Sequence, residues 1–141
     1  MIKAVLDTNV VVSGLLWTGV PREILRAAEE ERFFLFSSKE LLEELALVLC
    51  RPQFKRFLER RGLDFKDALA QMVRMARLVV SRPFSEVIIA KDPSDDQVLA
   101  CAVTAAANVI VTGDEHLLDL KKFRGIQIIT PAIFFQRSLS S

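Results

Sequence analysis

Residues 2–7 read IKAVLD, a short apolar segment that ends in a carboxylate. Residues 109–114 read VIVTGD and repeat the pattern, with Asp114 shortly after the last apolar position. Short runs with so little polar interruption are typical of strands that are covered on both faces, as in a parallel sheet. The two segments therefore predict central strands, each followed by an acidic residue at its carboxyl end.

Similar apolar runs alternate with longer segments of helical periodicity, which predicts repeated βαβ units. Strands are expected over residues 2–6, 33–36, 78–81, 109–112 and 126–130, and the run at 87–90 is ambiguous between loop and strand. Helices are expected over residues 10–16, 21–32, 39–49, 54–61 and 94–107, with one more opened by Asp64 and Asp67 and a last one from Pro131. No linker or repeat divides the chain. We therefore expect one α/β domain over residues 1–141.

Composition and charge exclude several classes of protein. Of the 141 residues, 51% are hydrophobic and 26% are charged, which is globular rather than disordered usage. No apolar run approaches the ~18 residues that a membrane helix needs, and the N-terminus does not read as a signal peptide, so a cytoplasmic protein is expected. Cys50 and Cys101 lie in apolar helical patterns and indicate buried, reduced thiols.

Asp7 and Asp114 are the first candidates for a functional site, because ligands bind open α/β sheets at the carboxyl ends of their strands. Each of them can equally be read as the cap of the helix that follows, as can Asn9. Three acids in the helix over 39–49 are separated by helical geometry: Glu43 should be solvated, and Glu40 fits a capping box with Ser37. Glu44 borders the apolar face, so it either looks into a cleft beside the sheet or is an exposed flank residue.

A third acidic group precedes the helix over 94–107. Asp92, Asp95 and Asp96 lie within five residues, and a capping box of Ser94 and Gln97 with the helix dipole explains one or two of them. Three carboxylates so close repel one another unless solvent or a cation lies among them. Helical geometry alone does not decide between Asp95 and Asp96.

These acids map to one edge of the predicted sheet, where a divalent cation would offset their mutual repulsion. All-oxygen ligands without Cys or His select Mg²⁺ or Mn²⁺, which can activate water towards a phosphodiester. No serine or cysteine nucleophile with a histidine base is evident. His116, the only histidine, is read as a surface or helix residue rather than a ligand, since it has no histidine partner.

Four short motifs, in order, resemble those of the PIN domains, and within them the toxin-like branch of toxin–antitoxin ribonucleases. The matching stretches are residues 6–9 (LDTN), Ser38 through Glu44 and Leu45, residues 92–96 (DPSDD) with Leu99 and Ala100, and residues 111–114 (VTGD). Each motif is individually weak, but the ordered set is fairly specific and spans nearly the whole chain.

The resemblance implies a three-layer α/β/α fold with a parallel five-stranded sheet ordered 3-2-1-4-5. It implies a catalytic Mg²⁺ or Mn²⁺ site at Asp7, Glu44, Asp96 and Asp114, in which the family pattern selects Asp96 over Asp95. It further implies Asp92 as an extra acid, and Asn9, Ser38 and Thr112 as polar residues that support the ligands. RNA cleavage, a homodimer and a neutralising antitoxin are implied as well.

A basic segment offers a weaker signal for nucleic acid. Arg51, Lys55 and Arg56, with Arg60 and Arg61, form either a strip that contacts RNA phosphates or a solvated helix face. A PIN-like structure-specific DNA nuclease is the enzymatic alternative, and a non-catalytic module that binds metal or RNA is the other. A haloacid-dehalogenase-like phosphatase is disfavoured because Asn9 stands where it needs a second aspartate.

Overall fold

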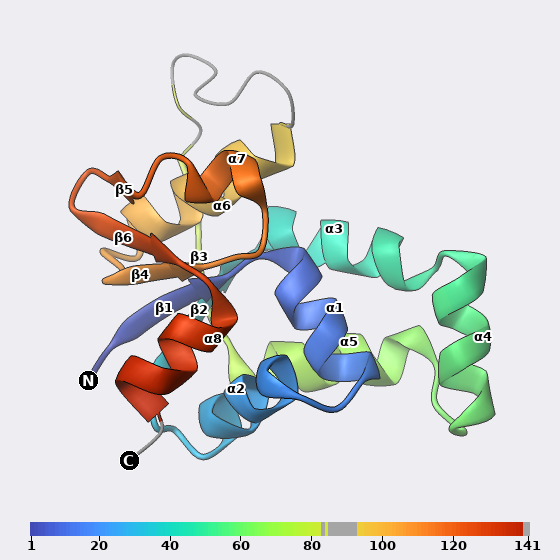
Figure 1. Cartoon of the computed structure of the whole chain (residues 1–141). Coiled ribbons are helices and arrows are strands. Elements are labelled where there is room, and N and C mark those ends of the chain that lie inside the picture. The colour runs from blue at the N-terminus through green and yellow to red at the C-terminus, as the bar shows by residue number, and fades with distance from the viewer. Residues whose placement is uncertain (83, 85–92, 140–141) are drawn as a thin grey trace.

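The computed structural model of the chain describes residues 1–82, 84 and 93–139, and it is organised around one mixed sheet (Figure 1). The strands are β1 (Lys3–Leu6), β2 (Phe34–Ser38), β3 (Arg77–Val79), β4 (Val109–Val111), β5 (Lys122–Phe123) and β6 (Ile126–Ile129), in the order β3-β2-β1-β4-β6-β5. All neighbouring pairs are parallel except β5 and β6. The α/β prediction is confirmed, and the difference from the expected five strands is the short edge strand β5.

The helices are α1 (Thr8–Leu16), α2 (Val20–Glu29), α3 (Lys39–Leu49), α4 (Pro52–Arg60), α5 (Phe65–Met75), α6 (Pro93–Thr104), α7 (Glu115–Leu118) and α8 (Pro131–Phe134), the last continued by a π-helical turn, Phe135–Leu139. The bounds of α3 agree with the prediction, and the other predicted helices shift by a few residues at their ends. The four-residue helix α7 was not predicted. The ambiguous run at 87–90 lies outside the described residues.

Alternation along the central strands divides the core between the two faces of the sheet. Ala4 and Leu6 join a cluster with α1, α2 and α8, whereas Val5 faces the opposite way and joins α6 and α7. In Figure 1, α6 and α7 accordingly lie above the sheet and α1, α2 and α8 below it. Burial on both faces explains why β1 after Lys3 and all of β4 are apolar.

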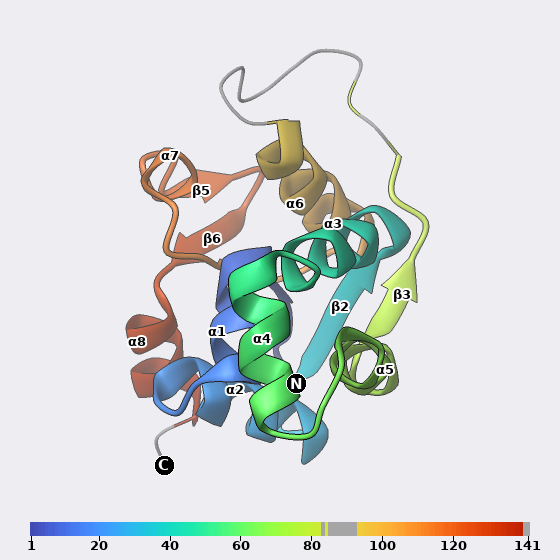
Figure 2. The same ribbon diagram turned by 90° about the vertical axis from the view of Figure 1, so that its right-hand side faces the viewer.

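Helix α3 bridges the two core clusters. Leu41, near its start, packs in the cluster with α6, whereas Leu45 and Leu49 pack in the cluster with α1. In Figure 2, α3 and α4 run across the front of the molecule, beside α1 and α6. This course carries α3 past the carboxyl ends of the central strands.

Two local predictions about caps and cysteines are corrected by the structure. Ser38, not Ser37, caps α3, and its side chain accepts a hydrogen bond from the Leu41 N–H at 3.3 Å. The expected Ser37–Glu40 capping box is therefore wrong, because β2 extends through Ser38 and moves the helix start by one residue. Cys50 is exposed at the end of α3 rather than buried, while Cys101 is buried as expected. No helix within the described ranges is long and apolar enough to cross a membrane.

Candidate metal centre

Asp7 occupies the junction between β1 and α1. Its backbone N–H donates to the Val111 carbonyl of β4 at 2.9 Å, so the residue is fixed between the two central strands. It is the N-cap residue of α1, as one reading of the sequence proposed, yet its side chain makes no capping hydrogen bond. Only 7% of Asp7 is exposed, and its carboxylate instead faces Thr112.

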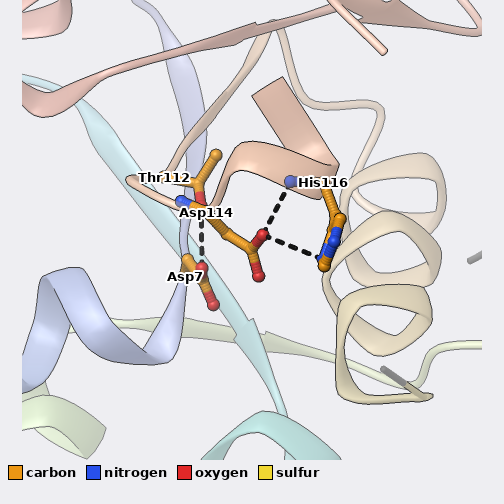
Figure 3. A network of polar contacts seen from close by, with 4 residues as sticks. All are labelled: Asp7, Thr112, Asp114 and His116. Atoms are coloured by element: carbon orange, nitrogen blue, oxygen red, sulfur yellow. Dashed lines mark hydrogen bonds and ion pairs between the residues drawn. The ribbon is translucent and has the colours of Figure 1, made fainter. Parts of the chain in front are cut away.

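Thr112 joins Asp7 to Asp114 through its hydroxyl group (Figure 3). The hydroxyl donates to Oδ2 of Asp7 at 2.7 Å and accepts from the backbone N–H of Asp114 at 3.0 Å. Thr112 is completely buried, so neither hydrogen bond competes with bulk water. The residue therefore fixes the positions of two predicted ligands relative to each other, which is what its predicted supporting role requires.

Asp114 begins the short helix α7 and lies between Asp7 and His116 (Figure 3). Its Oδ1 atom accepts the backbone N–H of His116 at 2.8 Å, and the His116 Nδ1 atom lies 3.6 Å from the same oxygen. Asp114 therefore does cap α7, which is one of the two roles that the sequence allowed. Only one of its two oxygens is used in the cap, so it leaves room for a ligand role.

The first turn of α6 brings a further acid to the same place. Asp95 is only 2% exposed, and one of its carboxylate oxygens lies within 4.8 Å of ligand atoms of Asp114 and His116. Asp96, which the family pattern selects, is half-buried on the same turn and is not a member of this three-residue group. Asp92 lies outside the described residues.

Glu44 is half-buried on α3, whereas Glu43 is exposed, as helical geometry predicts for the two residues. Helix α3 contacts both α1 and α6, the two helices whose first turns carry Asp7 and Asp96. Among the remaining predicted supporting residues, Ser38 is buried as the cap of α3. Asn9 is exposed in the first turn of α1.

The donor set fits a divalent cation. The acids come from the ends of β1 and β4 and from the start of α6, which meet at the carboxyl edge of the parallel sheet. Carboxylates at this spacing repel one another, and a cation among them would remove the repulsion. The N-termini of α1 and α6 add partial positive charge beside Asp7 and Asp95, which stabilises these carboxylates in the absence of metal.

The buried thiol near this region is not available for chemistry. Burial raises the pKa of Cys101 to about 11, although the side chains of Ser38 and Ser81 partly oppose that effect. A thiol with so high a pKa stays protonated near neutral pH, so Cys101 is neither a nucleophile nor a soft metal ligand.

Sequence reasoning missed the place of His116 in this group. The histidine is exposed, as expected, but its imidazole lies beside the carboxylates of Asp95 and Asp114. The signal was its position two residues after Asp114. That spacing became informative only when the structure showed that α7 is a helical turn, which points the His116 side chain towards α6.

A family model and a relative both match most of the chain. A family model described as the PIN domain matches residues 3–116, from β1 to the start of α7. An uncharacterized protein of Methanocaldococcus jannaschii, MJ1680, is 29% identical over 123 residues, which cover 85% of this chain and 76% of that protein.

Proposed function

The chain belongs to the PIN-domain family, whose members are generally metal-dependent nucleases, and we propose that it is a divalent-metal-dependent endoribonuclease. The observation that carries this proposal is the hydrogen-bonded link Asp7–Thr112–Asp114, with the Asp95 carboxylate beside it. The link joins acids that are far apart in sequence at one edge of the sheet. Such an arrangement is suited to holding a divalent cation.

In this proposal, Asp7, Glu44, Asp96 and Asp114 hold Mg²⁺ or Mn²⁺, and Asp92 adds a further acid. The bound ion would lower the pKa of a coordinated water and offset charge on a phosphoryl oxygen. Thr112 holds the Asp7 carboxylate and the backbone of Asp114 in position, which limits how far the two acids need to move to bind a cation. The supporting roles of Ser38 and Asn9 are proposed from the family pattern.

The chemistry needs no nucleophile from the protein. Cys101 is protonated at neutral pH because burial raises its pKa to about 11, and the Thr112 hydroxyl donates to Asp7. The chain has a single histidine, and it faces Asp114 rather than a serine or cysteine. Direct hydrolysis by water agrees best with these residues.

RNA as the substrate is supported by the surface of α4. Arg51, just before α4, and Lys55 and Arg56 on α4 are exposed, and the helix packs against the far end of α1. Trp17, 43% exposed, lies at the end of α1, where its ring contacts Phe54 and Phe57 with centroids 6.0 and 5.7 Å away. Cations beside a partly exposed aromatic ring are suited to a single strand, whose bases can stack while its phosphates are neutralised.

We also propose that the protein is the toxin component of a toxin–antitoxin module, forms a homodimer and binds a cognate antitoxin. The support is a set of apolar side chains that a monomer would leave in water. Leu47 on α3 is 74% exposed, and Leu78 and Val80, on and just after the edge strand β3, are 54% and 90% exposed. Exposed apolar side chains next to an open sheet edge are suited to a protein partner.

We expect purified protein to cut single-stranded RNA internally when Mg²⁺ or Mn²⁺ is present, and to stop when a chelator removes the ion. End-labelled RNA, the same sequence as single-stranded DNA, and a branched DNA duplex should be compared on denaturing gels. Cleavage of the branched DNA alone would favour the DNA nuclease instead. Binding of metal and RNA without any turnover would leave a non-catalytic module.

The double substitution Arg51→Ala and Lys55→Ala should weaken RNA binding and lower its salt dependence by about one to two ions released, because each phosphate contact releases a counterion. Affinity can be followed through Trp17, the only tryptophan in the chain, with a chelator present to prevent cleavage. The matched control is Lys66→Ala with Arg74→Ala on α5, which removes the same charge from exposed positions. If RNA binding by the two double variants has the same salt dependence, Arg51 and Lys55 are solvated residues that do not contact RNA.

A further inference from the structure

We propose that Trp17 stacks on one base of a single-stranded RNA, and that the exposed line of side chains on α1 leads the strand from this base to the acidic edge of the sheet. The inference rests on the proposed function and deepens it, because it assigns a subsite to the same nuclease and fixes its distance from the cleaved bond. The cations near α4 neutralise phosphates, whereas this subsite contacts a base.

Helix α1 exposes one line of side chains. Of its nine residues, all within the described part of the chain, seven are buried. The other two are Asn9, which is exposed, and Ser13, which is half-buried, and the exposed Trp17 follows directly after the helix. Residues four apart lie on the same face of a helix. The three side chains therefore form one line, which begins beside Asp7 and ends at Trp17.

The indole ring of Trp17 is held by its neighbours and is still accessible. Its centroid lies 6.0 Å from that of Phe54 and 5.7 Å from that of Phe57, while 43% of the residue is exposed. Both phenylalanines belong to α4, which Figure 2 shows in front of α1. The backbone N–H of Trp17 donates to the Ser13 carbonyl at 2.9 Å. A ring that is already fixed loses little conformational entropy when a base packs on it.

The charges beside Trp17 favour a nucleic acid over an apolar protein surface as the occupant. The Arg61 guanidinium lies 4.5 Å from the centroid of the Phe57 ring, which itself contacts Trp17. Residues 51–61 carry five exposed cations and a single acid, Glu59. An apolar partner would have to remove water from these charges, whereas a single strand neutralises them with phosphates and offers a base to the ring.

The length of α1 sets the distance between the stacked base and the cleaved bond. Asp7 is the residue before α1 and Trp17 is the residue after it, so they are ten positions apart. At about 1.5 Å per residue, this separation is about 15 Å along the helix axis. A stacked strand rises about 3.4 Å per nucleotide, so the distance corresponds to about four nucleotides, and to fewer if the strand is extended.

Removing single bases from the RNA tests the subsite. A single-stranded RNA that is cut at one bond is made with an abasic nucleotide at each position in turn, and kcat/KM is measured with Mg²⁺ or Mn²⁺. For the parent protein, one abasic position within about four nucleotides of the cleaved bond should lower kcat/KM about tenfold, because the stacking contact is lost. Trp17→Leu should cut the intact RNA about as slowly and should no longer distinguish the two RNAs. Trp17→Phe keeps a ring and should retain most of the distinction.

Val73→Ala is the matched control, because Val73 on α5 is 44% exposed, almost the same fraction as Trp17. This variant should depend on the base as the parent does. Each comparison is made between two RNAs with one protein, so a partial loss of folded protein cancels. The inference is overturned if Trp17→Leu and the parent respond alike to base removal at every position. It is also overturned if the Trp17 variants change only the oligomeric state, which would assign the ring to a protein interface.

Binding without cleavage separates this inference from the proposed function. With a chelator present, single-stranded RNA should quench the fluorescence of Trp17, the only tryptophan in the chain, and a fully abasic strand of the same length should quench it much less. Quenching without any metal-dependent cleavage would contradict the nuclease and support the stacking subsite. Cleavage without quenching would support the nuclease and overturn the subsite.

Discussion

Asp7→Asn is expected to reduce metal-dependent RNA cleavage at least about 1000-fold, equivalent to about 4 kcal/mol of lost transition-state stabilisation. The substitution keeps the size of the side chain and its hydrogen bond from Thr112, but it removes the negative charge that would hold the cation. Single-turnover cleavage at saturating Mg²⁺ or Mn²⁺ measures the loss. Metal affinity measured without RNA should fall with it.

The fold should survive this change. Removing one carboxylate relieves repulsion at the acidic edge, so the free energy of unfolding of the metal-free variant should equal or exceed that of the parent. Asp119→Asn, an exposed acid just after α7, is the control and should cleave normally. Normal cleavage by the Asp7 variant would remove the basis for the proposed function.

Thr112→Val is expected to weaken metal binding by about 10- to 100-fold through loss of support for the ligands. Valine matches the shape of threonine but removes the hydroxyl that donates to Asp7 and accepts from the Asp114 N–H. The loss of these two hydrogen bonds should also lower the free energy of unfolding by about 1–3 kcal/mol. Calorimetry with Mn²⁺ and denaturant unfolding measure the two effects.

Thr104→Val is the matched control, because Thr104 is exposed on α6 and the same atoms are exchanged. Its metal affinity and stability should both stay near those of the parent. Unchanged metal affinity in the Thr112 variant would show that Asp7 and Asp114 do not need this link to act together.

The central architecture could be predicted because β1 after Lys3 and β4 are buried on both faces and are therefore apolar. Strand β5 was missed because it has only two residues and its hairpin turn is made by Arg124 and Gly125, both at positive φ. An Asn-Gly or Asp-Gly pair would have signalled such a turn, whereas arginine does not. Helix α7 is one turn long, too short for a periodic pattern.

The candidate site, too, could be predicted only in part. Asp7 and Asp114 were visible because each follows an apolar strand, and Glu44 was separated from Glu43 by its angle on α3. The sequence pattern could not decide whether Asp95 or Asp96 faces the site, because that depends on the orientation of α6 about its own axis relative to the sheet. The structure brings Asp95 beside Asp114 and leaves Asp96 half-buried. The cleavage rates of Asp95→Asn and Asp96→Asn can now be compared directly.

The helix N-termini beside Asp7 and Asp95 bear on how the protein is regulated. Because these dipoles stabilise the acidic side chains and the two core clusters contain no predicted metal ligand, we expect the chain to fold without metal. Small zinc domains, in contrast, unfold when their metal is withdrawn. In the proposed nuclease, cation supply would then control turnover, and the metal would add to the stability of the fold only what its own binding supplies.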